Sequence, residues 1–110
     1  MGDEITKDAG RLLVLLYKSY KDRCKNGMDM EVSACFDGAD EVQAQFLPKR
    51  SGPDVLSLLW ELERHDFIET QCADNAITET ILTTKAISYM ENQLKNGLKE
   101  IAEFIGNLIP

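Results

Sequence analysis

The chain has 110 residues, of which 44% are hydrophobic and 28% are charged. This composition is typical of one soluble globular domain and excludes a long disordered or low-complexity chain. The formal net charge of −7 opposes binding to a phosphate backbone over the surface as a whole. The longest apolar run, residues 12–17, is too short to span a membrane, so no membrane partner is expected.

The cysteines indicate the redox environment in which the protein is found. Cys24, Cys35 and Cys72 are odd in number and widely spaced, which fits reduced thiols better than a disulfide framework. No export signal is recognisable at the start of the chain. We therefore expect a cytoplasmic protein.

Residues 4–25 carry apolar side chains at spacings of three and four, which predicts an amphipathic first helix. Its middle, residues 12–17, has too few polar positions for a solvent face. We therefore expect it to be covered on two sides, once by the core and once by something else. Asn26 and Gly27 predict its end, because both residues tolerate left-handed backbone conformations.

The next stretch predicts a strand and two helices. Residues 28–36 alternate polar side chains with apolar ones, the period of a short half-buried strand, and the apolar residues are Met30, Val32, Ala34 and Phe36. Residues 37–47 follow as a short helix, and residues 48–52 form a turn. Ser51 or Gly52 is then expected to cap a helix at about 53–66, with Pro53 as its first residue.

Two short strands and a last helix complete the chain. Residues 67–82 are rich in β-branched side chains around a turn at 73–75, and a threonine can cap a helix at about 83–108. The predicted order is α-β-α-α-β-β-α. The expected fold class is therefore α+β, mainly helical, with a single domain over residues 1–110 and a long C-terminal helix.

Two runs carry a resemblance to a known family. LLWELERHDFI (58–68) is similar to the "leucine, x, x, leucine-glutamate, x, x, glycine, leucine-isoleucine" pattern that ends many recognition helices. LTTKAISYME (82–91) is similar to the "leucine-threonine, x, lysine-glycine" stretch that follows a wing. Together with the element order, they make the chain resemble the winged helix-turn-helix superfamily of small bacterial and phage proteins. Asp66 and Ala86 stand where that family usually has glycine, although Asp also tolerates a left-handed helix stop.

The resemblance implies a recognition helix at about 53–66 and a wing at about 67–82. It further implies a homodimeric DNA-binding transcriptional regulator or accessory factor, with no enzyme activity and no cofactor. Because winged helices also bind proteins, the alternative is a protein-protein interaction adaptor that does not bind nucleic acid.

The charges on the predicted recognition helix and wing help to distinguish duplex DNA from a protein partner. A helical wheel of residues 53–66 places Asp54, Ser57, Glu61 and Arg64 outward, and the predicted wing contains no lysine or arginine. Double-stranded DNA is therefore disfavoured there. The candidate DNA contacts lie on the first helix, in the turn at 48–52 and on the next helix: Lys18, Lys21, Lys49, Arg50, Ser51, Ser57 and Arg64. A solvated helix end and a polar turn are the alternative interpretation of these residues.

Trp60 and His65 have plain structural interpretations. A lone tryptophan beside an apolar stripe predicts a residue at the edge of the core, and an exposed one would favour a protein partner. His65 is the only histidine, and no spacing of His or Cys predicts a metal site. No nucleotide-binding or catalytic motif is present.

The C-terminal segment predicts an interaction. Its apolar residues repeat at spacings of four, three, four and three, as in a coiled-coil seam: Leu94, Leu98, Ile101, Ile105 and Leu108. Together with the apolar middle of the first helix, including Leu15, this segment is the expected homodimer interface. In a monomer the same segment would lie on the first helix.

Overall fold

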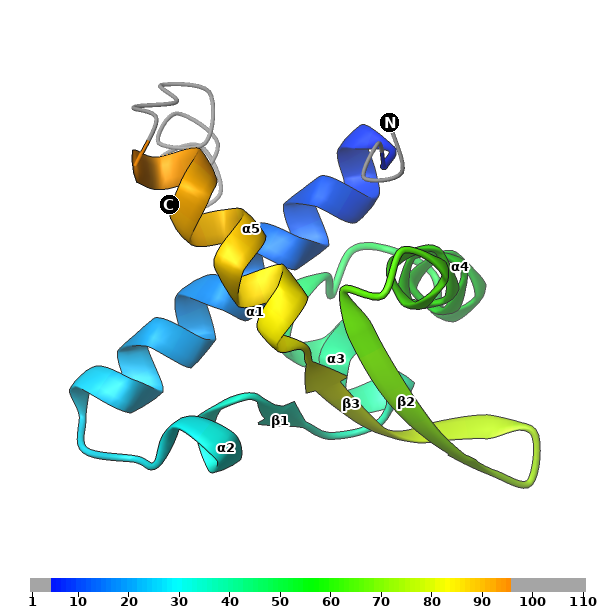
Figure 1. Ribbon diagram of the computed structural model, residues 1–110. Helices are drawn as coiled ribbons and strands as arrows, with labels where there is room; N and C mark the ends of the chain where they lie inside the picture. The colour runs from blue at the N-terminus through cyan, green and yellow to red at the C-terminus, as the bar shows by residue number, and fades with distance from the viewer. Residues whose placement is uncertain (1–4, 96–110) are drawn as a thin grey trace.

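The computed structural model describes residues 5–95, without the side chains of Leu94 and Lys95. Within that range the chain is α+β and mostly helical, with a small antiparallel sheet (Figure 1). The elements in chain order are α1 (Lys7–Lys25), α2 (Met30–Ser33), β1 (Cys35–Phe36), α3 (Ala39–Phe46), α4 (Gly52–Arg64), β2 (Ile68–Ala73), β3 (Ala76–Leu82) and α5 (Thr84–Lys95).

Helix α1 is the central element of the fold. The hydroxyl of Thr6 accepts a hydrogen bond from the Ala9 amide at 3.3 Å, which caps its first turn. Its end is a left-handed stop at Gly27, with φ of 95°, where the Met28 amide donates to the Arg23 carbonyl at 3.0 Å. Helices α3 and α4 pack against α1, and α5 crosses it in Figure 1. The apolar middle of α1 is accordingly covered on two sides, as its sequence predicts, and the second cover is α5.

The segment 28–36 differs from its prediction. Its alternating pattern predicts a strand, but residues 30–33 form the short helix α2, and only Cys35 and Phe36 pair with β3. The reason lies in backbone hydrogen bonding, because the Asp29 and Met30 carbonyls accept from the amides of Ser33 and Ala34 at 2.8 and 3.2 Å. The chain therefore has one more helix before β1 than the predicted order.

Helices α3 and α4 are joined by a tight turn. The Ser51 hydroxyl accepts from the Asp54 amide at 3.1 Å, so Ser51, one of the two residues expected as the cap, is the N-cap of α4. The helix begins at Gly52, one residue before the predicted start at Pro53. The Gln43 side-chain amide donates to the Arg50 carbonyl at 2.6 Å and ties the turn back to α3. At the far end of α4, Asp66 adopts φ of 62°, and the Phe67 amide donates to the Leu62 carbonyl at 3.0 Å. Asp66 thus provides the left-handed stop that its sequence position predicts.

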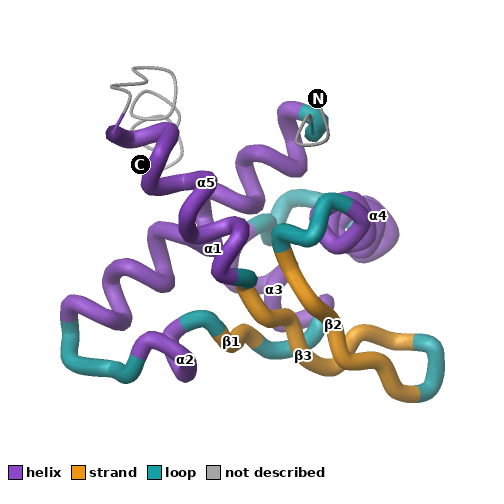
Figure 2. Tube along the Cα trace, in the orientation of Figure 1, coloured by secondary structure: helices purple, strands orange, loops and turns teal. Residues whose placement is uncertain are grey.

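Strand β3 lies between β1 and β2, and both pairings are antiparallel (Figure 2). Strands β2 and β3 form a hairpin whose two-residue turn is Asp74-Asn75, with φ of 52° and 65°. Positive φ at both turn residues is typical of the type I′ turns that match the twist of a hairpin. After β3, the Thr83 hydroxyl accepts from the Ala86 amide at 3.1 Å and caps α5, as predicted.

The core lies where α1, α4, α5 and the sheet meet. Its largest fully buried side chains belong to α1, α4, α5, α3 and the start of the hairpin: Leu12, Leu13, Leu16, Leu59, Leu62, Met90, Val42, Val55, Phe67 and Ile68. Gly38, just before α3, is also buried. A Cβ added there would lie 2.5 Å from the Ile77 carbonyl oxygen of β3. This contact sets how closely α3 approaches the sheet.

Candidate nucleic-acid interface

Helix α4 occupies the helix predicted at 53–66, and its outward face carries several of the predicted contact residues. Asp54, Ser57 and Arg64 are exposed on it. Glu61, predicted to point into solvent, is half-buried because its carboxylate accepts from the Thr6 amide at 2.6 Å and from the Thr6 hydroxyl at 2.8 Å. Glu61 therefore binds the start of α1 and is not free for an external partner. Arg64 is the only basic side chain on α4.

The hairpin beside α4 is acidic. Glu69 and Asp74 are exposed and Glu79 is half-buried, while the Thr70 hydroxyl donates to the carboxylate of Glu63 on α4. No lysine or arginine occurs between Arg64 and Lys85. Because a duplex presents a dense row of phosphate charges, these carboxylates would repel it.

The basic residues of the α3–α4 turn are only partly available. Arg50 lies 2.7 Å from the carboxylate of Asp8 on α1 and forms an ion pair with it. The Ser51 hydroxyl accepts the hydrogen bond that caps α4, and Lys49 is exposed. The structure therefore brings Lys49, Arg50 and Ser51 together at one turn, with Lys49 as the side chain that projects most freely.

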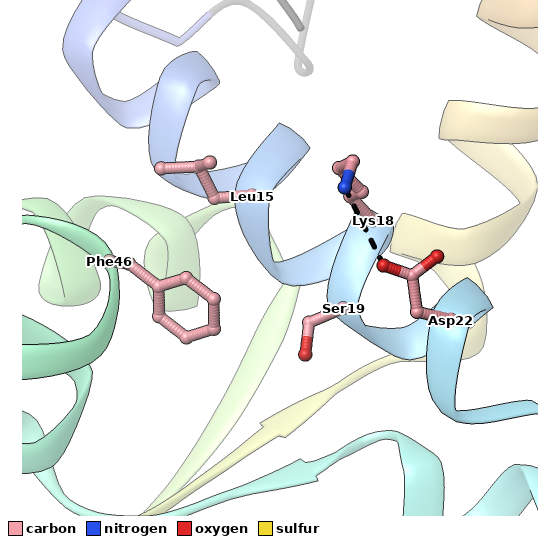
Figure 3. Close-up of a pocket in the computed structure, with 5 residues that line it drawn as sticks. All are labelled: Leu15, Lys18, Ser19, Asp22 and Phe46. Atoms are coloured by element: carbon pink, nitrogen blue, oxygen red, sulfur yellow. Dashed lines mark ion pairs between the residues drawn. The ribbon is translucent and has the colours of Figure 1, made fainter. Parts of the chain in front are cut away.

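Lys18 and Lys21 lie further along α1. Lys18 pairs with Asp22 at 3.5 Å, and Lys21 is exposed. Lys18, Asp22 and Leu15 line an open hollow of about 200 Å³ together with Ser19 and Phe46. Figure 3 shows the four α1 side chains on one helix and Phe46 beside them. Leu15, a predicted dimer contact, is half-buried there. The other predicted dimer residues lie outside the described side chains: Leu94, Leu98, Ile101, Ile105 and Leu108.

Two tyrosines lie under α5. Burial raises the pKa of Tyr17, and the carboxylate of Glu91 on α5 raises it further. Burial also raises the pKa of Tyr20, with a smaller contribution from its hydrogen bond to Cys24. Both phenols are protonated at neutral pH even at their ordinary pKa, and their burial makes them packing residues of α1.

Trp60 and His65 occupy structural positions. Trp60 is half-buried and packs against the core, as the core-edge interpretation predicts. His65 stacks on Phe67 with ring centroids 6.3 Å apart, and its carbonyl accepts from the Lys85 ammonium at 3.0 Å. Over residues 5–95, no group of three or more His, Cys, Asp or Glu side chains is arranged to hold a metal ion.

One surface was missed by the sequence analysis. Met28, Met30 and Val32 are 43%, 69% and 54% exposed, which is unusual for side chains of this size. The alternating pattern placed Met30 and Val32 on the buried side of a strand. The helical turn of α2 instead exposes both side chains. The strongest sequence signal for that turn is Asp29, a possible helix cap.

Comparisons of the chain with protein-family models, with curated proteins and with solved structures found no match. In the part of the chain that the structure describes, no helix combines the length and apolar character that a membrane crossing requires.

Proposed function

We propose that the chain is a winged helix. The arrangement supports this, because α3, a tight turn and α4 are followed directly by the β2–β3 hairpin, and β1 joins the same sheet at the outer edge of β3. In this proposal α4 corresponds to the recognition helix and the β2–β3 hairpin to the wing. Helix α2 is an addition to the usual order.

We further propose that it acts as a protein-protein interaction adaptor, for which the charge of α4 and the wing is the supporting observation. Glu69, Asp74 and Glu79 lie on the wing without a basic residue among them, and Glu61 is committed to Thr6. This surface suits a protein partner that presents lysine or arginine. The free thiols of Cys24, Cys35 and Cys72 support a cytoplasmic location.

The experiment compares two charge reversals of equal size. The wing variant is Glu69→Lys with Glu79→Lys, and the control is Asp29→Lys with Glu31→Lys on and beside α2. Each protein is immobilised, and the captured proteins from a cell extract are compared by mass spectrometry. The adaptor proposal expects a partner that is retained by the unmodified chain and by the α2 control but is lost by the wing variant. If the wing variant captures the same proteins as the unmodified chain, the proposal is overturned.

A second candidate is a DNA-binding transcriptional regulator, supported by the exposed Lys49 beside Arg50 in the turn before α4. The two functions differ in a salt titration of duplex binding. A regulator loses affinity steeply as salt rises, because each neutralised phosphate releases counterions. The adaptor proposal expects no duplex binding by the unmodified chain at low salt. A steep salt dependence of measurable binding would favour the regulator.

We also propose that the protein is a homodimer. The support is the C-terminal apolar repeat, together with the half-buried Leu15 beside an open hollow. Sedimentation equilibrium tests it, since a mass of 12.4 kDa at every concentration would indicate a monomer.

A further inference from the structure

The exposed apolar side chains of α2 and the loop before it have no cover within the described chain. We call Met28, Met30 and Val32 the methionine face. Figure 1 shows α2 at a corner of the molecule, away from both α4 and the hairpin tip. Among residues 5–93, whose side chains the structure describes, no other large hydrophobic side chain is exposed. Exposed apolar surface of this kind marks interaction sites when it is clustered, and methionine suits such sites because its side chain adapts in shape.

The methionine face is held in place. Arg23 donates through one nitrogen to the Cys35 carbonyl at 2.7 Å and to the Ser33 carbonyl at 3.3 Å. Its guanidinium carbon also lies 4.4 Å from the centre of the Phe36 ring. Ser33 is fully buried, and its hydroxyl donates to the Met28 carbonyl at 3.4 Å. The outward direction of Met30 and Val32 is thus set by contacts on both sides of α2.

The charges around this face define what it can bind. Asp29 and Glu31 are exposed among the three apolar residues, and Glu31 lies between Met30 and Val32 on the helical turn of α2. A complementary partner therefore needs an apolar stripe with cations close beside it. The chain itself contains such a stripe, because Leu98, Ile101, Ile105 and Leu108 recur at helical spacing in its C-terminal segment. On a helical wheel, Lys95 and Lys99 fall together on one flank of that stripe.

The position of α5 decides which copy supplies the segment. In Figures 1 and 2, α5 ends on the other side of α1 from α2. The 15 residues after Lys95 would have to turn back around α1 to reach the methionine face of their own chain. We propose that the methionine face binds the C-terminal segment, residues 98–108, of a second copy of this chain. The exchange is reciprocal, as in a two-fold symmetric dimer, and it rests on the homodimer proposed above.

Methionine methyl signals test the docking without any substitution. The chain contains four methionines, and Met90 on α5 is 1% exposed, so it serves as an internal control. With ¹³C-labelled methionine methyl groups, the signals of Met28 and Met30 should shift with protein concentration in step with the dimer fraction from sedimentation. The Met90 signal should stay constant. A dimer that forms without any shift of Met28 and Met30 overturns this site and leaves the homodimer standing.

A charge exchange provides the second test. Asp29→Lys with Glu31→Lys should raise the dimer dissociation constant about tenfold, because the new lysines face Lys95 and Lys99 of the second copy. Lys95→Glu with Lys99→Glu should do the same, and combining all four substitutions should restore most of the affinity. The matched control is Glu69→Lys with Glu79→Lys on the hairpin, which changes the net charge equally and should leave the dissociation constant unchanged.

The proposal is also overturned by a monomer at all concentrations, by equal weakening with the hairpin control, or by a combined variant that binds no more tightly than either pair alone. A further comparison uses Ile101→Glu under conditions where the chain is a monomer. If this substitution changes the Met28 and Met30 signals of the monomer, the occupant is the protein's own C-terminal segment. That outcome also overturns the second copy as the occupant.

Discussion

The α2 corner and the β2–β3 hairpin both project from the body of the molecule, but they present opposite chemistry. The hairpin tip carries Asp74 and Asn75 into solvent, and the methionine face carries Met28, Met30 and Val32. A polar projection is stable in water without any cover. Exposed apolar side chains are less favourable in water than in contact with other apolar groups, so a partner that buries them is stabilised. The two regions therefore support protein contacts on different grounds: the corner through exposed apolar area, and the hairpin through its acidic charge alone.

The two projections are also anchored differently. The base of the hairpin is apolar, since Phe67, Ile68 and Leu82 are almost fully buried. The corner depends on one cation, Arg23, which connects α1 to the carbonyls of Ser33 at the end of α2 and of Cys35 just after it. Packing should therefore dominate the stability of the hairpin, and charge-assisted hydrogen bonding should dominate that of the corner.

The largest expected effect comes from removing the apolar anchor of the hairpin. Phe67 is 0% exposed, and its ring lies 5.0 Å from that of Tyr89 on α5. Phe67→Ala should lower the free energy of unfolding by about 3–5 kcal/mol, because it leaves a cavity where α4, β2 and α5 meet. Urea denaturation measures the loss, and Glu69→Ala on the exposed side should change it by less than about 0.5 kcal/mol. A loss below about 1 kcal/mol for Phe67→Ala would show that the hairpin is not anchored by packing.

An intermediate effect is expected at the corner. Arg23→Ala leaves the Ser33 and Cys35 carbonyls without their donor and should cost about 1.5–3 kcal/mol. Arg23→Lys should recover only part of this, because an ammonium cannot reproduce the planar geometry of the guanidinium over Phe36.

Hydrogen exchange locates that effect. The amides of Ser33 and Ala34, which close the turn of α2, should exchange faster in Arg23→Ala, while the hairpin amides keep their protection relative to global unfolding. Equal loss of protection in both regions would mean that the corner and the hairpin unfold as one unit.

The smallest effect is expected where the two regions meet. Thr80 on β3 pairs with Phe36 of β1 on one side and with Thr70 of β2 on the other. It is fully buried, and its hydroxyl has no hydrogen-bond partner in the described structure. Thr80→Val keeps the shape and removes the unsatisfied oxygen, so it should stabilise the fold by about 1 kcal/mol.

Thermal and urea unfolding of Thr80→Val check this value. Thr80→Ser is the contrasting variant, because it keeps the hydroxyl and loses the methyl group. Destabilisation by valine would indicate that the hydroxyl is satisfied in solution, for example by a buried water molecule.

Much of the fold could be predicted because local chemistry and tertiary packing agree along most of the chain. Ser51, Thr83 and Asp66 mark helix boundaries by capping or by left-handed geometry, and each does so in the structure. The pattern at 28–36 misled because residues 30–33 form a helical turn, in which alternate residues do not lie on one side as they do in a strand. There, Arg23 and the helical turn of α2 decide the outcome.

The candidate interface was less predictable for a different reason. A helical wheel places Glu61 outward, but it contains no information about Thr6, which lies 55 residues away in sequence. Likewise, Arg50 is a free cation by its position in a turn, and its partner Asp8 belongs to α1. Residue type and spacing indicate which side chains carry charge, whereas tertiary contacts determine which of these charges remain available.

The close approach at Gly38 has a consequence for sequence variation. With 2.5 Å between an added Cβ and the Ile77 carbonyl oxygen, even alanine would require α3 or the backbone of β3 to move. Its backbone angles, φ −75° and ψ −178°, are ones that any residue can adopt, so the restriction is purely one of space. A chain that shares this architecture should therefore keep glycine directly before α3 even where its surface has diverged beyond recognition. Position 38 can then serve as a marker when more distant relatives are sought.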